Sequence, residues 1–426
     1  DRRPRLREGS SSVHQFQEWG FESLALLGQS WAELAPDEEL AATVVSRGIL
    51  QVDESDPVCP DKALVLGPVR VLPKEQPRLS VRLVDVDPAG AADVAAPRRW
   101  RARGGTSQAQ RQEQHALAND LWEELLAPPA CEIVALRQGR RWLQASLPHL
   151  LPPVVDPAKG FRRHGVYLFA GGFSEVGLAL AGELAAKYAA RLVLVSRLTL
   201  PPAEVWQRLG QGWGEAAVRR AIAAIDRLEE AGAEVLHIRA DVTDFEQMSA
   251  AVTAASQRFG GLDGVFHCAG ALEDGLLTTK TLEGMQRVLA PKVSGARVLG
   301  AVLATVPLDF LVLFSSTSTD VPRAGQVDYA AANAYLNAYA CSAATGERRV
   351  IAVHWGVWNE VGLAARAIGR GRTVELPSRP AHGPLLTRWM DDGGLPFLEA
   401  TIATNTHWVL DEHRISSGAA VFPGTG

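Results

Sequence analysis

From residue 166 onward, short apolar runs alternate with longer stretches whose apolar residues recur at the spacing of an amphipathic helix. Six of the short runs have the length and the β-branched and aromatic content of buried strands. These predicted strands occupy residues 166–170, 192–196, 233–240, 262–267, 308–314 and 349–355. Strands that alternate with helices in this way form parallel sheets, so we predict an α/β fold with a doubly wound parallel sheet.

The first 155 residues show a different pattern, which predicts a smaller α/β unit. No glycine-rich turn joins a strand to a helix in this part of the chain. Its predicted helices are residues 17–34 and 116–127, and its strand-like runs are residues 62–72, 78–86 and 132–145. The Pro-rich segment 147–160 has the composition of a linker. We therefore expect three parts, at residues 1–155, 160–376 and 380–426.

Composition narrows the classes of function. The chain has 426 residues, of which 47% are hydrophobic and 21% charged, so it can form about two to four domains with large cores. The formal net charge of −5 contains no long block of one sign, which argues against nucleic acid or an anionic membrane as partner. Because we find neither a signal peptide nor a run of about 18 apolar residues, we expect a cytoplasmic protein.

The cysteines give no sign of a disulfide framework or a metal site. They are scattered, without a CxxC pair or a histidine at ligand spacing, at Cys59, Cys131, Cys268 and Cys341. We therefore expect buried, reduced thiols and no bound metal. For Cys268 and its neighbour His267, packing at the end of a strand is the expected role.

Glycines cluster where the first strand of the larger unit runs into a helix. The segment AGGFSEVGLALAGELA carries Gly171, Gly172 and Gly177 at this turn, and Ser174 occupies the second glycine position of the pattern GxGxxG. Glycines there let the backbone approach a pyrophosphate, and the helix N-terminus that follows favours an anion. We predict a Rossmann-type dinucleotide site, with a simple tight turn as the alternative.

The ends of later strands supply further candidate ligands of the cofactor. The second strand ends at Ser196 and Arg197, where NAD-binding proteins usually carry an acidic residue for the ribose. An arginine suits a 2′-phosphate, so NADPH is the predicted cofactor. Small or hydrogen-bonding residues follow two more strands, at Asp241 and Val242 and at Ala269 and Gly270.

A tyrosine and an asparagine share one face of the predicted helix DYAAANAYLNAYA. Tyr329 and Asn333 are four residues apart, and Ser316 ends the preceding strand thirteen residues before the tyrosine. Lys292 lies in the helix before that strand, and a neighbouring ammonium would lower the pKa of the phenol. Each residue alone has an ordinary structural explanation, as a cap, a strand end or a solvated charge. Their joint spacing favours a site that delivers a proton.

Several segments together resemble the ketoreductase domain of type I polyketide synthases, a branch of the short-chain dehydrogenase/reductase family. The segments are GVYLFAGG, ADVTD, GLDGVFHCAG, FSS, GQVDYAAANAYLNA and HWGVW. The most specific feature is the order Lys292, Ser316, Tyr329, Asn333. In many other members of the larger family the lysine follows the tyrosine by four residues, whereas here Asn333 occupies that position.

The resemblance implies an activity and a role for each of these residues. Tyr329 would donate a proton to a ketone oxygen, Ser316 would hydrogen-bond the same oxygen, Lys292 would lower the tyrosine pKa, and Asn333 would order the proton relay. NADPH would supply hydride to a β-ketoacyl thioester held by an acyl carrier protein. The first 155 residues would be a truncated Rossmann unit that binds no cofactor and lacks its beginning.

Departures from the family pattern leave a second hypothesis open. The family turn usually reads TGGLGGLG, whereas this chain has Ala170, Ser174 and Glu175. Ser174 would narrow the approach of the pyrophosphate, and Glu175 would repel it unless the carboxylate faces outward, as we expect. A catalytically inactive domain that serves as a scaffold within a synthase is therefore the alternative. A free-standing reductase of small ketones is a third possibility.

The resemblance also implies residues that orient the substrate. The family's LDD marker appears here as LED, residues 272–274, and Val321 replaces the tryptophan that marks the opposite class. A D-configured hydroxyl is implied. The substrate-orienting set would be Asp274, Gln326, Trp355 and Trp358. For the two tryptophans, a place in the core is the alternative to a groove wall.

The last segments resemble the opening of a dehydratase domain of the same kind of synthase. In HWVLDEHRISSGAAVFPGTG, His413 matches a catalytic histidine, and Pro423 and Gly424 match the turn that follows, with one extra residue between them. Neighbouring domains of one synthase are therefore expected partners. A ketoreductase followed directly by a dehydratase resembles the order in iterative synthases.

Overall fold

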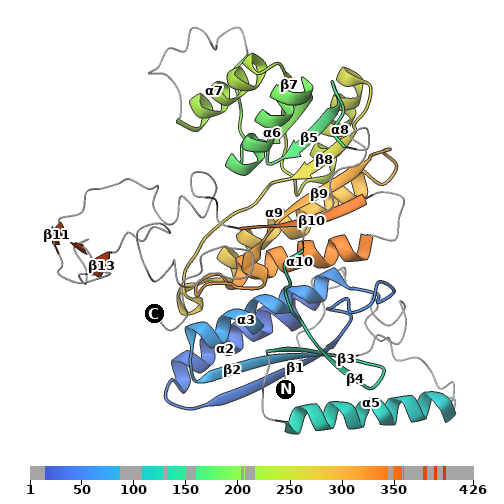
Figure 1. Ribbon diagram of the computed structural model, residues 1–426, viewed down its shortest axis with the longest axis vertical. Coiled ribbons are helices and arrows are strands. Elements are labelled where there is room, and N and C mark those ends of the chain that lie inside the picture. Colours follow the sequence, from blue (N-terminus) through green and yellow to red (C-terminus); the bar gives the residue numbers. More distant parts are fainter. Residues whose placement is uncertain are drawn as a thin grey trace, which may run out of the picture. The chain divides into compact units, whose positions relative to one another are not determined.

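The computed structural model divides the chain into two compact units, residues 1–357 and 358–426. It describes residues 15–86, 108–127, 132–149, 160–202, 206, 216–343, 349–356, 358, 378–380, 388–390 and 397–399. The first unit contains a four-stranded and a six-stranded sheet (Figure 1).

The six-stranded sheet is entirely parallel. Its strands are β5 (Val166–Ala170), β6 (Arg191–Ser196), β7 (Glu234–Arg239), β8 (Gly264–His267), β9 (Phe310–Ser316) and β10 (Arg349–Trp355). Their order is β10-β9-β8-β5-β6-β7, so the chain builds outward from β5 to β7 and then returns to the other side of β5. All six predicted strands are confirmed within two residues at each end. This is the doubly wound order, whose ligand-binding crevice lies where the winding reverses, here between β5 and β8.

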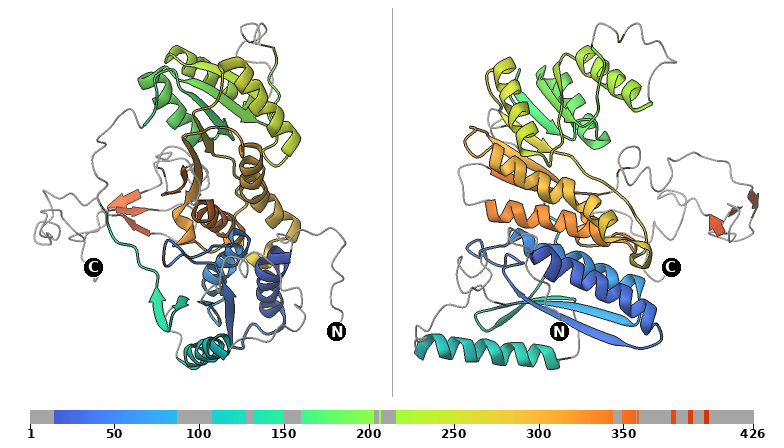
Figure 2. Two further views of the ribbon diagram at one scale, coloured as in Figure 1. Left: turned by 90° about the vertical axis from the view of Figure 1, so that its right-hand side faces the viewer. Right: turned by 180° about the vertical axis from the view of Figure 1, so that it is seen from behind.

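Helices cover both faces of this sheet. They are α6 (Glu175–Tyr188), α7 (Ala216–Glu230), α8 (Phe245–Phe259), α9 (Leu282–Val302) and α10 (Val327–Ala343). Side chains alternate along β5, so that Leu168 packs with α8, α9 and α10 and Phe169 packs with α6 and α7. In both views of Figure 2, α9 and α10 run beside each other. The two apolar layers between the sheet and its helices hold in place the strand ends that carry the candidate site.

The four-stranded sheet belongs to the first part of the chain. Its elements are η1 (Gln17–Glu22), α2 (Ser23–Leu34), β1 (Leu40–Arg47), η2 (Pro60–Val65), α3 (Leu66–Glu75), β2 (Leu79–Val86), α5 (Gln108–Leu126), β3 (Ile133–Arg137) and β4 (Arg140–Leu143). The order is β1-β2-β3-β4, with the first three strands parallel and β4 antiparallel. The strand β1 was not among the predicted elements.

The strand predicted at residues 62–72 is wrong, because this segment forms η2 and α3. The residues are buried on all sides, so their apolar run has no period that could separate a strand from a helix. Gly67 shows why the segment is so enclosed. A Cβ atom there would lie 2.2 Å from the carbonyl oxygen of Val327 and 2.7 Å from Cβ of Ala331, so α3 packs closely against α10.

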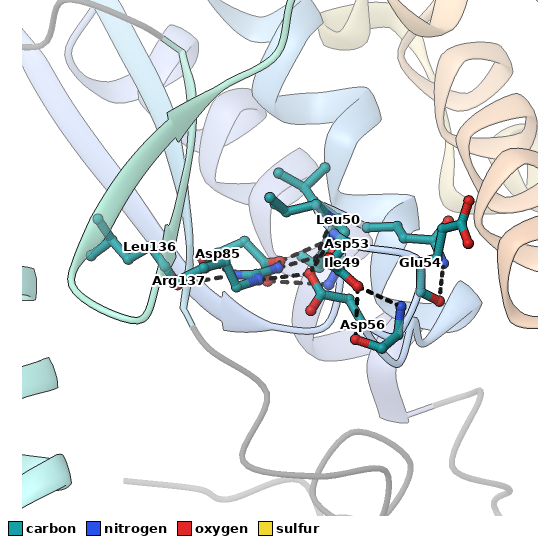
Figure 3. Close-up of polar contacts among 11 residues, drawn as sticks. Ile49, Leu50, Asp53, Glu54, Asp56, Asp85, Leu136 and Arg137 are labelled. Carbon is teal, nitrogen blue, oxygen red and sulfur yellow. Dashed lines mark hydrogen bonds and ion pairs between the residues drawn. The ribbon is translucent and has the colours of Figure 1, made fainter.

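A buried ion pair fills the carboxyl edge of the smaller sheet (Figure 3). Arg137, at the end of β3, contacts Asp85, at the end of β2, with 2.7 Å between Nη2 and Oδ2. Asp85 is fully buried and also accepts the N–H groups of Ile49 and Leu50, while Nε of Arg137 lies 3.0 Å from Oδ2 of Asp56. Burial raises the pKa of Asp85, and Arg137 opposes this. Side chains of the protein thus occupy the edge at which parallel sheets usually bind ligands.

The second unit contains a small antiparallel sheet of β11 (Ser378–Pro380), β12 (Arg388–Met390) and β13 (Phe397–Glu399). The dehydratase-like residues His413, Pro423 and Gly424 lie outside the described residues. Within the described ranges, no helix is long and apolar enough to span a membrane, and no group of three metal-ligating side chains occurs.

Candidate active site

The glycine turn lies at the crevice between β5 and β8. Gly171 has a φ of 87°, and a Cβ atom there would lie 2.5 Å from the backbone nitrogen of Ala269. A Cβ atom at Gly172 would lie 2.7 Å from Cβ of Leu194. Both positions therefore require glycine. The tight turn lies at the place where a pyrophosphate binds in this kind of fold.

Ser174 is the N-cap of α6. Its Oγ accepts a hydrogen bond from the backbone N–H of Gly177 at 3.3 Å. Gly177 lies so close that a Cβ atom there would be 2.5 Å from this Oγ and 3.3 Å from Sγ of Cys268. Glu175 is the first helical residue and is partly exposed, so the direction of its carboxylate toward a cofactor stays a prediction. The serine that departs from the family pattern thus starts the helix.

Arg197 and Asp241 meet beyond the ends of β6 and β7. The Arg197 side chain is 80% exposed, and its Nη1 lies 4.0 Å from Oδ2 of Asp241. Asp241 also accepts hydrogen bonds from the backbone and hydroxyl of Thr243. Ser196 pairs through Oγ with Nε2 of His237 at 3.0 Å, a partner that the sequence did not suggest. The exposed guanidinium is accessible to an anion such as a phosphate.

Ala269 and Gly270 connect the glycine turn to Lys292. Gly171 approaches Ala269, and a Cβ atom at Gly270 would lie 3.3 Å from Cε and 3.7 Å from Nζ of Lys292. Val242 is buried against Gly295 of α9. The structure thus brings three of the predicted cofactor segments, after β5, β7 and β8, to one edge of the sheet.

Lys292 is buried and bonded to the strand that carries Ser316. Its Nζ donates to the carbonyl oxygen of Phe314 at 2.6 Å, and only 5% of the residue is exposed. Burial lowers the pKa of Lys292 to about 8, against a smaller opposite effect of Cys268. The alternative of a solvated lysine, which the sequence left open, is therefore excluded.

Tyr329 and Asn333 stand on the first two turns of α10. The side-chain nitrogen of the fully buried Asn333 donates to the carbonyl oxygen of Tyr329 at 2.7 Å, and Ser315 donates to the carbonyl oxygen of Asn333 at 3.2 Å. Burial raises the pKa of Tyr329, while Ser316 and Asn333 lower it. The net direction is opposite to the lowering that we expected from Lys292. The reason is that burial outweighs the polar neighbours of the phenol.

The two residues of the LED and GQVDY segments that we predicted to orient the substrate contact each other. Nε2 of Gln326 donates to Oδ2 of Asp274 at 3.0 Å, and the carboxylate of Asp274 contributes to the raised pKa of Tyr329. Trp355 packs edge-on against Phe314 at 5.5 Å between ring centroids, which is the core contact considered as an alternative. Trp358 begins the second unit and is partly buried.

Two charged residues that the sequence reasoning missed lie directly behind Tyr329. Lys280 and Asp328 form an ion pair with 2.7 Å between Nζ and Oδ2, and their side chains are only 7% and 1% exposed. Oδ1 of Asp328 accepts the backbone N–H of Tyr329 at 2.8 Å. A carboxylate at the start of an apolar helix was a signal that could have found this pair.

Comparison with known proteins shows which family this part of the chain resembles. Residues 165–360 match the family model described as KR domain. The 6-methylsalicylic acid synthase of Aspergillus terreus is 36% identical over 219 residues, which are 51% of this chain and 12% of that protein. Polyketide synthase ThaG of Burkholderia thailandensis is 30% identical over 345 residues, which are 80% of this chain and 5% of that synthase.

The fold is shared with solved structures as well. A ketoreductase domain from the bacillaene assembly line superimposes with a TM-score of 0.61 at 24% identity, over 84% of this chain and 75% of that domain. The chain spans only a small part of the length of the two synthases. The family match, the parallel sheet and the order of the site residues together show that residues 165–360 belong to the KR domain family, the ketoreductases of polyketide synthases.

Proposed function

We propose that this chain reduces a β-ketoacyl thioester, carried by an acyl carrier protein, to a β-hydroxyacyl thioester during polyketide synthesis, with NADPH as the cofactor. The observation that carries the proposal is the meeting of Tyr329, Ser316 and Asn333 at the carboxyl edge of the sheet, beside the crevice where its winding reverses. A ketone bound there would lie beside the protonated phenol of Tyr329 and the hydroxyl of Ser316.

The residues at the sheet edge fit a dinucleotide. Added Cβ atoms at Gly171 and Gly172 would collide with Ala269 and Leu194, so these glycines permit the tight turn whose backbone would approach the pyrophosphate. Arg197, with its 80% exposed guanidinium, would hold the 2′-phosphate that distinguishes NADPH from NADH. Asp241, Val242, Ala269 and Gly270 would line the adenine and ribose. When bound, NADPH supplies the hydride.

Tyr329 would act as the general acid. Its raised pKa keeps the phenol protonated at neutral pH, which is the form that can donate to the ketone oxygen. The Ser316 hydroxyl would hydrogen-bond the same oxygen, where negative charge develops. Asn333 holds the first turns of α10 through the carbonyl of Tyr329. Lys292, with a pKa of about 8, can both give and take a proton near neutral pH and would replenish the site.

The proposal extends to configuration and partners. Asp274 and Gln326 would set the face of the ketone that is attacked, and the LED segment favours a D-configured hydroxyl. The acyl carrier protein would deliver the substrate through its phosphopantetheine arm. The parent synthase would also contribute neighbouring domains, with the dehydratase-like segment leading into one of them.

An inactive scaffold is the second candidate, and the replacement of family glycines by Ser174 and Glu175 favours it. The capping bond from the N–H of Gly177 to Oγ of Ser174 weakens that argument, because the serine has a structural task that leaves Gly171 and Gly172 unchanged. Detectable NADPH binding in calorimetry would count against the scaffold.

We predict that Tyr329→Phe abolishes turnover, because it removes the donated proton and keeps the ring. NADPH oxidation is followed with a β-ketoacyl pantetheine thioester and with the carrier-bound substrate. Loss of a general acid lowers kcat by about 100-fold to 10,000-fold.

Tyr339→Phe is the matched control, because it removes a hydroxyl from the same helix far from Ser316 and should leave turnover largely unchanged. Equal turnover in wild type and Tyr329→Phe would exclude the proposed role. Much faster reduction of diffusible ketones than of the carrier-bound substrate would favour a free-standing reductase.

A further inference from the structure

We propose that Glu75, the last residue of α3, is a positioning residue that controls product configuration by fixing two substrate-orienting loops against each other. The Asp274 loop is residues 268–281, between β8 and α9, and the Gln326 loop is residues 320–326, before α10. The inference rests on the proposed function, since it concerns which face of the ketone that site reduces.

Each carboxylate oxygen of Glu75 binds a different loop. Oε2 accepts the backbone N–H of Leu277 at 2.6 Å, and Oε1 accepts the backbone N–H of Gly325 at 2.8 Å. Both bonds are short, and their two acceptors belong to one carboxyl group. One side chain at the end of α3 therefore bridges two segments that are 48 residues apart, counted as 325 minus 277.

The bridged loops also contact each other at the substrate-orienting residues. The backbone N–H of Gly275 donates to the carbonyl oxygen of Gly325 at 3.1 Å, and Gln326 donates to Asp274 at 3.0 Å. Gly325 thus has its N–H on Glu75 and its carbonyl on the other loop. Its φ of 87° and the 3.2 Å between a hypothetical Cβ atom and the nitrogen of Gly275 leave it little freedom. A shift of Gly325 would therefore move Gln326 relative to Asp274.

Neighbours of Glu75 hold the same loops at other points. Gln29, on α2, donates from Nε2 to the carbonyl oxygens of Leu277 and Lys280, both at 2.8 Å. Lys74 donates from Nζ to the carbonyl oxygen of Pro322 at 2.7 Å. These bonds attach each loop to the smaller sheet separately. Unlike Gln29 and Lys74, Glu75 binds both loops at once.

This arrangement links the smaller sheet to stereochemistry. The ketone oxygen stays at Tyr329 and Ser316, so the configuration depends on how the rest of the substrate lies across Asp274 and Gln326. The preference for one orientation is a difference between two binding free energies, and a small displacement of the guiding side chains changes it. Loosening the bridge should therefore lower selectivity more than it lowers turnover.

Two substitutions test the bridge on the full chain. Glu75→Ala removes both acceptors, and Glu75→Gln keeps the size but turns one acceptor into a donor that faces a backbone N–H. The configuration of the hydroxyl product is measured by chiral chromatography after reduction of a β-ketoacyl pantetheine thioester. We expect the minor product configuration to increase by roughly tenfold in Glu75→Ala. The increase should be smaller in Glu75→Gln.

Gln76→Ala is the matched control. Gln76 follows Glu75, and its amide donates to the carbonyl oxygen of Gly28, on α2, at 2.8 Å. Its loss should lower the melting temperature and leave the product configuration unchanged, as a purely structural bond would.

Hydrogen exchange gives a readout that does not need activity. The amides of Leu277 and Gly325 should exchange faster in Glu75→Ala and in Glu75→Gln, and at the wild-type rate in Gln76→Ala. Wild-type protection at both amides in the Glu75 variants would overturn the bridge. Faster exchange with an unchanged product configuration would overturn its control of stereochemistry. A wild-type chain without turnover would refute the proposed function, while the exchange data would still decide on the bridge.

Discussion

Lys292 has the most demanding environment of the proposed catalytic residues. Its ammonium is almost completely buried in α9, and its bond to the carbonyl of Phe314 ties the helix to the end of β9, next to Ser315 and Ser316. An unpaired charge in such a place costs stability, and the lowered pKa of Lys292 reflects this cost. In the proposed reaction, the gain would be a proton carrier with a pKa of about 8.

We predict a pH-dependent stability that Lys292→Met removes. The side chain of a lysine in the unfolded chain has a pKa of about 10.4. At a pH between this pKa and the folded pKa of about 8, the unfolded chain therefore binds more protons than the folded chain. The unfolding free energy therefore rises with pH in this window, and this gain is lost as the pH falls back through about 8. The change should reach about 3 kcal/mol in wild type relative to Lys292→Met.

Urea unfolding of both proteins without cofactor, from below pH 8 to about pH 10, measures this difference. A constant difference in unfolding free energy across the range would show that Lys292 keeps an ordinary pKa.

The identity and order of the proposed catalytic residues could be predicted from the sequence, but the surroundings of their side chains could not. Tyr329 and Asn333 stand on one helix face, as their spacing indicated. The raised pKa of Tyr329 depends on how deeply α10 packs, and this burial comes partly from Gly67, more than 250 residues earlier. No local pattern contains that information.

At the scale of elements, α6 shows how a departure from the family pattern is accommodated. Ser174 caps the helix, and Gly177 leaves room for its hydroxyl and for Cys268. The first strand and this turn were predictable, because an apolar run followed by clustered glycines has few alternatives. The helix α3 was not, since a segment that is apolar on every side carries no period.

We predict that Ser174→Ala lowers the unfolding free energy by about 1 kcal/mol, because it removes the cap. Ser174→Gly should cost only a few tenths of a kcal/mol, since glycine is accepted as an N-cap, and should bind NADPH at least as tightly as wild type. Urea unfolding and calorimetric titration measure the two effects.

Thr281→Ala is a control of the same kind, because Thr281 caps α9 through a 3.0 Å bond from the N–H of Gly284. It should lose similar stability with unchanged NADPH affinity. A loss of NADPH binding in Ser174→Gly would mean that the serine itself is a cofactor ligand.

At the scale of the whole molecule, the two sheets of the first unit have different tasks. The carboxyl edge of the larger sheet carries the glycine turn and the exposed Arg197, whereas Arg137 and Asp85 close the corresponding edge of the smaller sheet. The smaller part instead supplies Glu75 to the loops around the site. Such contacts join residues about 200 or more positions apart, so a single sequence could predict both sheets and not how one supports the other.

In the proposed reaction, hydride passes from NADPH to a β-ketone held at Tyr329. The most direct measurement is reduction of a β-ketoacyl thioester with NADPH that carries deuterium at the transferable position of the nicotinamide, followed by mass and chiral analysis of the product. We predict one deuterium on the β-carbon of a D-configured hydroxyacyl thioester in wild type and none in Tyr329→Phe. Recovery of unlabelled, unreduced thioester from the wild-type chain would contradict the account.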